Sequence, residues 1–294
     1  MTSRPRDNLR FGPKQDARGR KPGRGVHGRL AVRAAPLLFR ARVTLGALLC
    51  MVPLGGPATA IAEGRSAPCQ SVTFEGARYL SCTFDPARTE FAVHLGRPDG
   101  TAYGSVRAFA ASEGTSEDAP AVAMNGGMYH ADLSPVGLYV EDGQERMGLV
   151  TSDGPGNFHL KPNGVFFVTE DGKPGVLETE AFAEANLPVR HATQSGPMLV
   201  IDGAIHPRIL PNGSTRFIRN GVGVTEDGSV VFAVSLDRVS FGNFARFFRD
   251  HAGARNALFL DGKVSALAIG TDMQIGSWFP AGPILAAYPK GGGD

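Results

Sequence analysis

Short apolar stretches separated by turn-forming pairs that end in glycine constrain the fold of this chain most strongly. An Asp-Gly pair between apolar runs is typical of a two-residue β-hairpin turn. Repeated hairpins predict an α+β protein, a single domain of mostly antiparallel β-sheet with a few covering helices. The pairs are Glu75-Gly76, Asp171-Gly172, Asp202-Gly203, Asp227-Gly228 and Asp261-Gly262.

Apolar patterning places the individual elements. Helices are expected at 105–112, 178–185 and 241–251. In the last of these, Phe244, Phe247 and Phe248 recur at helical spacing, so we expect them to pack in the core. Strands are expected at 70–75, 77–84, 91–95, 121–124, 136–140, 164–169, 197–201, 221–225, 230–236 and 256–260.

Basic residues are concentrated at the amino terminus. Residues 1–42 hold twelve lysines and arginines against two acidic residues, which leaves 18 basic against 26 acidic residues in the rest of the chain. An acidic body offers no basic face to a polyanion, so we expect no nucleic-acid partner. Residues 1–28 are rich in arginine, glycine and proline, and we expect them to form a disordered basic arm.

A short apolar run at 43–54 follows the arginines of the arm, and small residues at cleavage-like spacing come next. This pattern is typical of a secretory signal peptide, and glycine and proline interrupt the run. We therefore expect 29–62 to be a signal peptide or an N-terminal membrane segment, and 63–294 to be the exported domain. The protein is expected to be periplasmic or secreted, touching a membrane only through that segment if it stays uncleaved.

The cysteines fit an oxidising compartment. Cys50 lies inside the apolar run, which leaves Cys69 and Cys82 in the exported domain. If Glu75-Gly76 forms a two-residue turn, Cys69 opposes Cys82 at a non-hydrogen-bonded position, where side chains come closest. A cross-strand disulfide is expected, with two separate buried thiols as the alternative.

Four polar segments next to apolar strands are candidates for a functional site. Glycines let a ligand approach backbone N–H groups, a serine hydroxyl donates to an anion, and an arginine binds phosphate or carboxylate through two N–H groups. An aspartate directly after a buried strand presents its carboxylate at the strand end. Each segment alone also fits a hairpin turn or a surface side chain. In chain order, the segments are Asn125-Gly126-Gly127 with Tyr129, Gln194-Ser195-Gly196, Arg219-Asn220, and Asp261-Gly262 with Ser265.

A serine nucleophile and a metal centre are both disfavoured. Thr193 and Pro197 stand where the glycines of a nucleophile elbow belong, so Ser195 is expected to donate to an anion instead. The seven histidines are scattered, there is no His-Glu-x-x-His segment, and the cysteines lack zinc spacing. We expect neither a metal nor a cofactor.

The order and spacing of these segments resemble the phosphodiester glycosidase domain family, whose members include an enzyme that removes N-acetylglucosamine from a sugar-1-phosphodiester. The resemblance runs from about Cys69 to Tyr288 and looks closest to the bacterial exported branch. Many members have Asp-Gly-Gly-Gly-Ser where this chain has Lys263 and Val264 between Gly262 and Ser265. The matching pieces are Val122 to Tyr129, Gln194 to Leu199, Arg219 to Gly223, and Leu260 to Gly262 with Ser265.

The resemblance implies a hydrolase that cleaves the glycosidic bond of a sugar-1-phosphodiester and releases a sugar and a phosphomonoester. A non-catalytic module that binds an envelope glycan or phosphoglycan is the alternative. Asn125, Arg219 and Asp261 are the expected catalytic residues. This assignment requires four distant loops to meet in one cleft that seats an anion beside a single acid. The expected substrate-binding residues are Gly126, Gly127, Tyr129, Gln194, Ser195, Gly196, Asn220 and Ser265.

Overall fold

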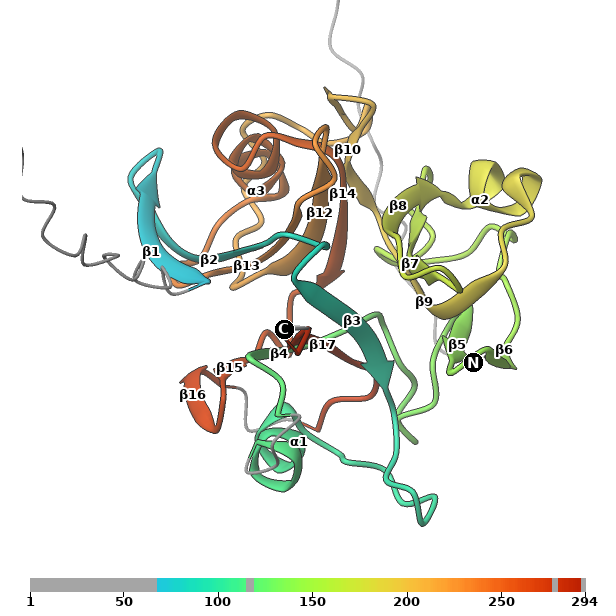
Figure 1. Ribbon diagram of the computed structural model, residues 1–294. Coiled ribbons are helices and arrows are strands. Elements are labelled where there is room, and N and C mark those ends of the chain that lie inside the picture. The colour runs from blue at the N-terminus through green and yellow to red at the C-terminus, as the bar shows by residue number, and fades with distance from the viewer. Residues whose placement is uncertain (1–67, 115–118, 277–279, 292–294) are drawn as a thin grey trace, which may run out of the picture. The chain divides into compact units, whose positions relative to one another are not determined.

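Three antiparallel sheets make up the part of the chain that the computed structural model describes, residues 68–114, 119–276 and 280–291 (Figure 1). The arm and the signal segment expected at 1–62 lie outside these residues. Residues 63–294 form one compact unit. The expected fold class, mostly antiparallel sheet with a few helices, is confirmed.

The first sheet has seven strands in the order β1-β2-β13-β12-β14-β10-β11. The second has the order β16-β15-β4-β17-β3, and the third β6-β5-β9-β7-β8. The strands of the first sheet are β1 (Cys69–Phe74), β2 (Ala77–Phe84), β10 (Met198–Ile201), β11 (Ala204–Ile205), β12 (Asn220–Thr225), β13 (Val230–Ser235) and β14 (Ala254–Asp261). Those of the second are β3 (Thr89–His94), β4 (Val122–Asn125), β15 (Leu267–Ile269), β16 (Asp272–Ile275) and β17 (Ile284–Pro289). Those of the third are β5 (Tyr139–Glu141), β6 (Gln144–Met147), β7 (Gly164–Thr169), β8 (Pro174–Glu178) and β9 (Val189–Ser195).

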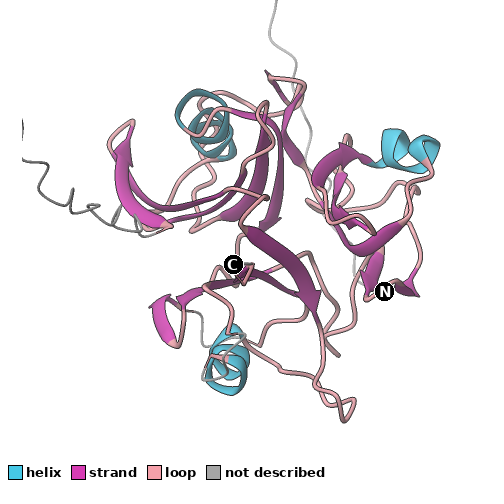
Figure 2. Cartoon of the chain, viewed as in Figure 1, coloured by secondary structure: helices cyan, strands magenta, loops and turns pink. Residues whose placement is uncertain are grey.

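One central core joins all three sheets. It contains Phe232 from the first sheet, Phe91 and Leu285 from the second, and Tyr139 and Phe166 from the third. Helices cover the opposite faces: α1 (Val106–Glu113) contacts β4 and β15, and α2 (Thr179–Ala185) contacts β7 and β8. The helix α3 (Phe241–Arg246) contacts β10, and Figure 2 shows the three helices on three separate groups of strands. Because both faces of the sheets are covered, a strand such as β13 is apolar along most of its length and buried throughout.

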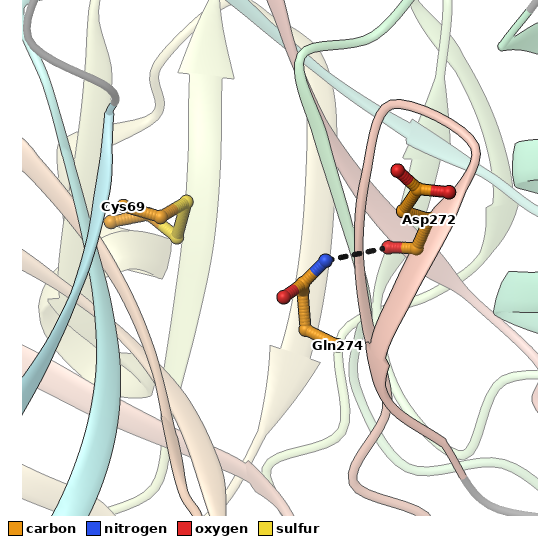
Figure 3. The surroundings of a disulfide bond; sticks show 4 residues. Cys69, Asp272 and Gln274 are labelled. Atoms are coloured by element: carbon orange, nitrogen blue, oxygen red, sulfur yellow. Dashed lines mark hydrogen bonds between the residues drawn. A yellow bond between two sulfur atoms is a disulfide. The ribbon is translucent and has the colours of Figure 1, made fainter.

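The amino-terminal hairpin forms as expected. Glu75 and Gly76 both have positive φ, and the resulting turn aligns Cys69 with Cys82. The two cysteines form a disulfide across β1 and β2 (Figure 3). The same view includes β16, where the side chain of Gln274 donates to the carbonyl of Asp272 (3.2 Å).

The phenylalanine stripe forms a core beneath its helix. Ser240 caps α3 by accepting from the Asn243 N–H (3.1 Å), and Phe244 and Phe248 are fully buried against the first sheet. The helix does not stay α-helical to its end as expected, because residues Phe247–His251 form a π-helical turn, η1. None of the helices among the described residues is long and apolar enough to cross a membrane.

The two apolar runs that flank Asn125 do not pair with each other. The first becomes β4, which lies between β15 and β17 in the second sheet. The second ends in β5, which pairs with β6 and β9 in the third sheet. The hairpin alternative for Asn125-Gly126-Gly127 is therefore wrong, and the segment instead connects two sheets.

Candidate active site

The predicted segments lie where the ends of strands from all three sheets come together. Ser195, at the end of β9, donates its hydroxyl to the carbonyl of Leu260 in β14 (3.1 Å). Asn220, at the start of β12, donates to the carbonyl of Asn125 at the end of β4 (2.8 Å). These two contacts tie the third and second sheets to the first. The four distant segments thus gather at one place.

Asn125 and Asn220 form a buried amide pair that fixes the position of Asp261. Asn220 Nδ2 also donates to Asn125 Oδ1 (3.0 Å), which in turn accepts from the Ala266 N–H (2.8 Å). Asn220 Oδ1 accepts from the backbone N–H of Asp261 (3.0 Å). Both amides are buried and satisfied by the protein, so their geometry supports a positioning role behind the site.

Arg219 is a buried cation held by neutral groups. Its side chain is 1% exposed, and its guanidinium lies 3.7 Å from the ring centre of Phe241. Nε donates to the Val239 carbonyl (3.0 Å) and Nη2 to the Thr215 carbonyl (3.4 Å). Burial lowers the pKa of Arg219 to about 10, which leaves it charged at neutral pH. No carboxylate among the described residues lies within ion-pair distance of it.

The carboxylate of Asp261 is oriented by the turn that follows it. Oδ1 accepts from the backbone N–H of Lys263 (2.6 Å) and, at 3.4 Å, from that of Val264. Hydrogen bonds from the described residues reach Oδ1 alone and leave Oδ2 without a partner among them. One carboxylate oxygen is therefore anchored and the other is available for chemistry.

Arg219 and Asp261 share a cavity of about 610 Å³, which we call the polar depression. Its wall also carries Tyr129, His130 and Asn157. A neighbouring cavity of about 540 Å³, the apolar depression, adjoins it. The two share the wall formed by Tyr129, Ala131, Phe217, Gly262, Lys263 and Val264.

Tyr129 contributes an aromatic wall to both depressions. Its hydroxyl donates to the carbonyl of Pro280. Burial, with a smaller contribution from the negative charge of Asp261, raises its pKa to about 12. The phenol is therefore neutral at physiological pH, and Tyr129 lines both depressions as an uncharged aromatic residue.

The two glycines after Asn125 serve close packing. The Gly126 N–H donates to the Pro283 carbonyl (2.7 Å), and neither glycine has a positive φ. A Cβ on Gly127 would lie 2.6 Å from both the Gln194 carbonyl oxygen and the Thr193 hydroxyl. A glycine is thus needed where β9 crosses this segment, and the Gly126 N–H is not free to bind an anion.

The remaining predicted residues also lie behind the cavity wall. The Gln194 amide accepts from Leu138 and Val150 and donates to Val150 and Thr179. Ser195 is fully buried, which argues against a nucleophilic role. A Cβ on Gly196 would lie 2.6 Å from the Phe158 carbonyl oxygen. Ser265 Oγ lies 3.3 Å from the carbonyl oxygens of both Ile218 and Asp261 and can donate its one proton to either.

Several wall residues were not predicted. Phe217 lines both depressions and is 39% exposed, and Arg238 lines the apolar depression. Asn157 reaches the polar depression from a loop before β7. No sequence signal indicated Phe217, because the exposure that distinguishes it from the other phenylalanines is a property of the structure. No group of three or more His, Cys, Asp or Glu among the described residues is arranged to hold a metal ion.

Comparisons with known proteins point in one direction. Residues 119–277 match the family described as phosphodiester glycosidase. The chain is 37% identical over 183 residues to the uncharacterized protein YigE of Escherichia coli (strain K12), across 62% of this chain and 71% of YigE.

Two solved structures share the fold at 15% identity, each with a TM-score of 0.53 over 76% of this chain. One is the zebrafish N-acetylglucosamine-1-phosphodiester alpha-N-acetylglucosaminidase catalytic domain, auto-inhibited by its pro-peptide, of which 82% is covered. The other is a hypothetical protein from Synechocystis, of which 61% is covered.

Proposed function

This chain belongs to the phosphodiester glycosidase family, and from that membership we propose that it hydrolyses the bond between a sugar's anomeric carbon and a phosphodiester oxygen. The products are a free sugar and a phosphomonoester. The observation that carries the proposal is a buried guanidinium that has no ion pair among the described residues and shares a cavity with one anchored carboxylate.

The guanidinium of Arg219 supports a phosphate ligand. A buried charge without a countercharge is costly, because the low-dielectric interior solvates it poorly. Neutral carbonyls and the Phe241 ring compensate part of that cost, and a phosphate in the polar depression would supply the missing negative charge. The planar guanidinium suits such a ligand because it can donate to two phosphate oxygens at once.

A single carboxylate is enough for this reaction. The leaving group is a phosphomonoester, whose second pKa is about 6, so it departs as an anion without a strong acid. Ordinary glycosidases instead need a second carboxyl group to protonate an alkoxide-like leaving group. Asp261 either takes a proton from the attacking water or attacks the anomeric carbon itself, while the C–O bond breaks and its electron pair leaves with the phosphate. In the second case, water then hydrolyses the glycosyl ester on Asp261, which frees the sugar and restores the carboxylate. Arg219 stabilises the charge that grows on the phosphate oxygens.

The polar groups behind the wall position this pair. Asn220 accepts from the backbone N–H of Asp261 and is itself bonded to Asn125, and Ser195 donates to the carbonyl of the preceding residue, Leu260. Tyr129, His130 and Asn157 remain on the wall to contact the sugar. On this proposal, three of the predicted site residues contact substrate, namely Tyr129, Arg219 and Asp261.

The proposed location is periplasmic or secreted. The disulfide between Cys69 and Cys82 supports an oxidising compartment, and the signal-like run before the domain supports export. The proposed partner is a sugar-1-phosphodiester or an envelope glycan carrying one, with membrane contact only through the N-terminal segment if it is retained.

A release assay tests the proposal. The purified protein is incubated with a panel of sugar-1-phosphodiesters, and free sugar and phosphomonoester are measured together. Equimolar release of both supports the hydrolase. If the protein binds panel members in calorimetry but releases no product, the non-catalytic module is supported. If it neither binds nor hydrolyses any of them, both proposed functions are overturned.

A further inference from the structure

The apolar depression is chemically different from its polar neighbour. Its floor and sides come from Leu133, Ile218, Val264 and the rings of Tyr129 and Phe217. Among the described residues that line it, none carries a carboxylate or a side-chain amide. A sugar needs several hydrogen-bonding partners, so this surface suits a ligand with an apolar body.

The charged groups on this depression are both cations. Lys263 lines both depressions and is exposed, while its backbone is fixed by the hydrogen bond to Asp261. Arg238 lines the apolar depression alone, and its guanidinium lies 5.5 Å from the ring centre of Phe217. An apolar surface with a cationic edge complements an aliphatic group joined to an anion.

The boundary between the depressions is the natural place for the phosphate. Gly262 belongs to the shared wall, and a Cβ on it would lie 3.5 Å from Nη1 of Arg219. Lys263 follows it on the same wall. A phosphate at this boundary would therefore meet cations from both depressions, with its two ester groups directed to opposite sides.

Leu133 is an independent indication that this surface is used. It has φ = 71°, a left-handed conformation uncommon for a leucine, and it lines the apolar depression. Such strained residues gather at ligand-binding sites, where the surrounding structure holds them in place. Here the strain places an apolar side chain where Asn or Gly would fit the backbone better.

From these features we propose that the alcohol on the far side of the phosphodiester is aliphatic, so that the substrate is a sugar phosphate linked to a lipid-like alcohol. The sugar occupies the polar depression, the phosphate lies at Gly262 and Lys263, and the aliphatic chain fills the apolar depression. This inference rests on the proposed function for the orientation of the substrate, but its binding test does not require turnover.

The test measures the affinity of the phosphomonoester products. Methyl, butyl and hexyl phosphate are titrated into the wild-type protein by calorimetry, with glycerol phosphate as the polar comparison. Affinity is expected to rise roughly two- to fourfold with each methylene group that leaves water. Equal affinity along the series, or tighter binding of glycerol phosphate, would overturn the inference.

The variant Leu133→Asn tests whether the gain in affinity with alkyl chain length arises in the apolar depression. Asn tolerates the left-handed conformation better than Leu, so the fold should be retained, and the hexyl-to-methyl affinity ratio should fall at least about fivefold. Leu210→Asn is the matched control, because Leu210 is 72% exposed and lines neither depression. An unchanged ratio in Leu133→Asn, with the wild-type series intact, would show that the chain binds elsewhere and overturn the assignment to this depression.

Turnover separates this inference from the proposed function. Hydrolysis of methyl, hexyl and glycerol phosphodiesters of the same sugar at equal kcat/KM would leave the hydrolase intact and overturn the aliphatic specificity. If affinity rises from methyl to hexyl phosphate but no ester is hydrolysed, the apolar subsite is supported and the proposed hydrolase activity is overturned.

Discussion

Arg219 and Asp261 differ from the buried amides of the site in having hydrogen-bonding capacity left for a ligand. The guanidinium is buried against Phe241 without an ion pair among the described residues, and one oxygen of the Asp261 carboxylate accepts no hydrogen bond from them. Asn125 and Gln194, in contrast, use their amides within the protein. This difference is the basis for assigning chemistry to Arg219 and Asp261 and a supporting role to the buried amides.

Replacing Asp261 with Asn should abolish turnover while leaving phosphate binding largely intact. The amide cannot act as base or nucleophile, yet its oxygen can keep the turn to Lys263. We expect kcat to fall by at least about 1,000-fold in the release assay, with little change in Tm.

Asp202→Asn is the control for that variant, since Asp202 is an exposed turn residue with positive φ that lines neither depression. It should keep wild-type kcat. Full activity in Asp261→Asn would end the assignment of this carboxylate.

Replacing Arg219 with Lys should weaken the handling of phosphate even though the charge is kept. A lysine cannot make two parallel hydrogen bonds and cannot stack flat on Phe241. We expect kcat/KM to fall by about 100-fold or more, the size seen when one stabilising donor is lost. Unchanged kcat/KM with a lowered Tm would instead give Arg219 a structural role.

At the scale of elements, hairpins between neighbouring strands could be predicted from the sequence, whereas pairings between strands distant in the chain could not. The β1–β2 and β12–β13 hairpins form at the turn pairs expected for them, because a short turn fixes the register of its own strands. Glu75-Gly76 is a two-residue turn, whereas the turn that contains Asp227-Gly228 spans the three residues between Thr225 and Ser229. No such signal exists for β4, whose partners β15 and β17 lie more than a hundred residues away. Its position between them, and hence the position of Asn125, depended on tertiary packing.

The third sheet shows a second reason for missed elements. β9 was not expected because its sequence includes His191, Thr193, Gln194 and Ser195, which do not alternate between polar and apolar. These side chains are buried because hydrogen bonds within the protein satisfy them, including those of Gln194 and Ser195. The same burial explains why the sequence could indicate that these segments are polar but could not show which of their side chains are used inside the protein.

The ion pair between β2 and the loop after β13 should make stability depend on acid pH. Arg78 donates to both carboxylate oxygens of Asp237, and these bonds lower its pKa to about 2. Because the folded pKa is depressed, the stabilisation is present above the ordinary value of 3.8 and is lost as pH falls toward 2.

Thermal unfolding of Arg78→Gln across pH measures this effect. The variant should have a lower Tm than the wild type above pH about 4, and the difference should vanish near pH 2. A difference that persists unchanged at pH 2 would assign the effect of Arg78 to packing instead.

For the whole molecule, the buried asparagine pair is a joint between the first and second sheets. Asn220→Ala would leave the Asn125 carbonyl and the Asp261 N–H without partners. We expect a loss of about 3 kcal/mol in the free energy of unfolding, a decrease of roughly 6–12 °C in Tm, together with a lower kcat.

Asn256→Ala provides the comparison for that joint. Asn256 is half-buried in the same sheet, and its side chain accepts one hydrogen bond, from the Asp202 N–H (2.9 Å). It should lose about 1 kcal/mol or less. If both variants lose the same stability, Asn220 does not join the sheets in the way we describe.

The burial of Ser195 has a practical consequence for finding inhibitors. A serine enclosed between strands and bonded to Leu260 cannot meet an electrophile, so activity-based probes for serine hydrolases should leave this protein unmarked in a cell extract. On the proposals above, better candidates carry a phosphate mimic for the boundary between the two depressions and an aliphatic chain for the apolar depression. A library of serine-reactive electrophiles, which is a common first choice for a hydrolase, would therefore be unsuitable for this protein.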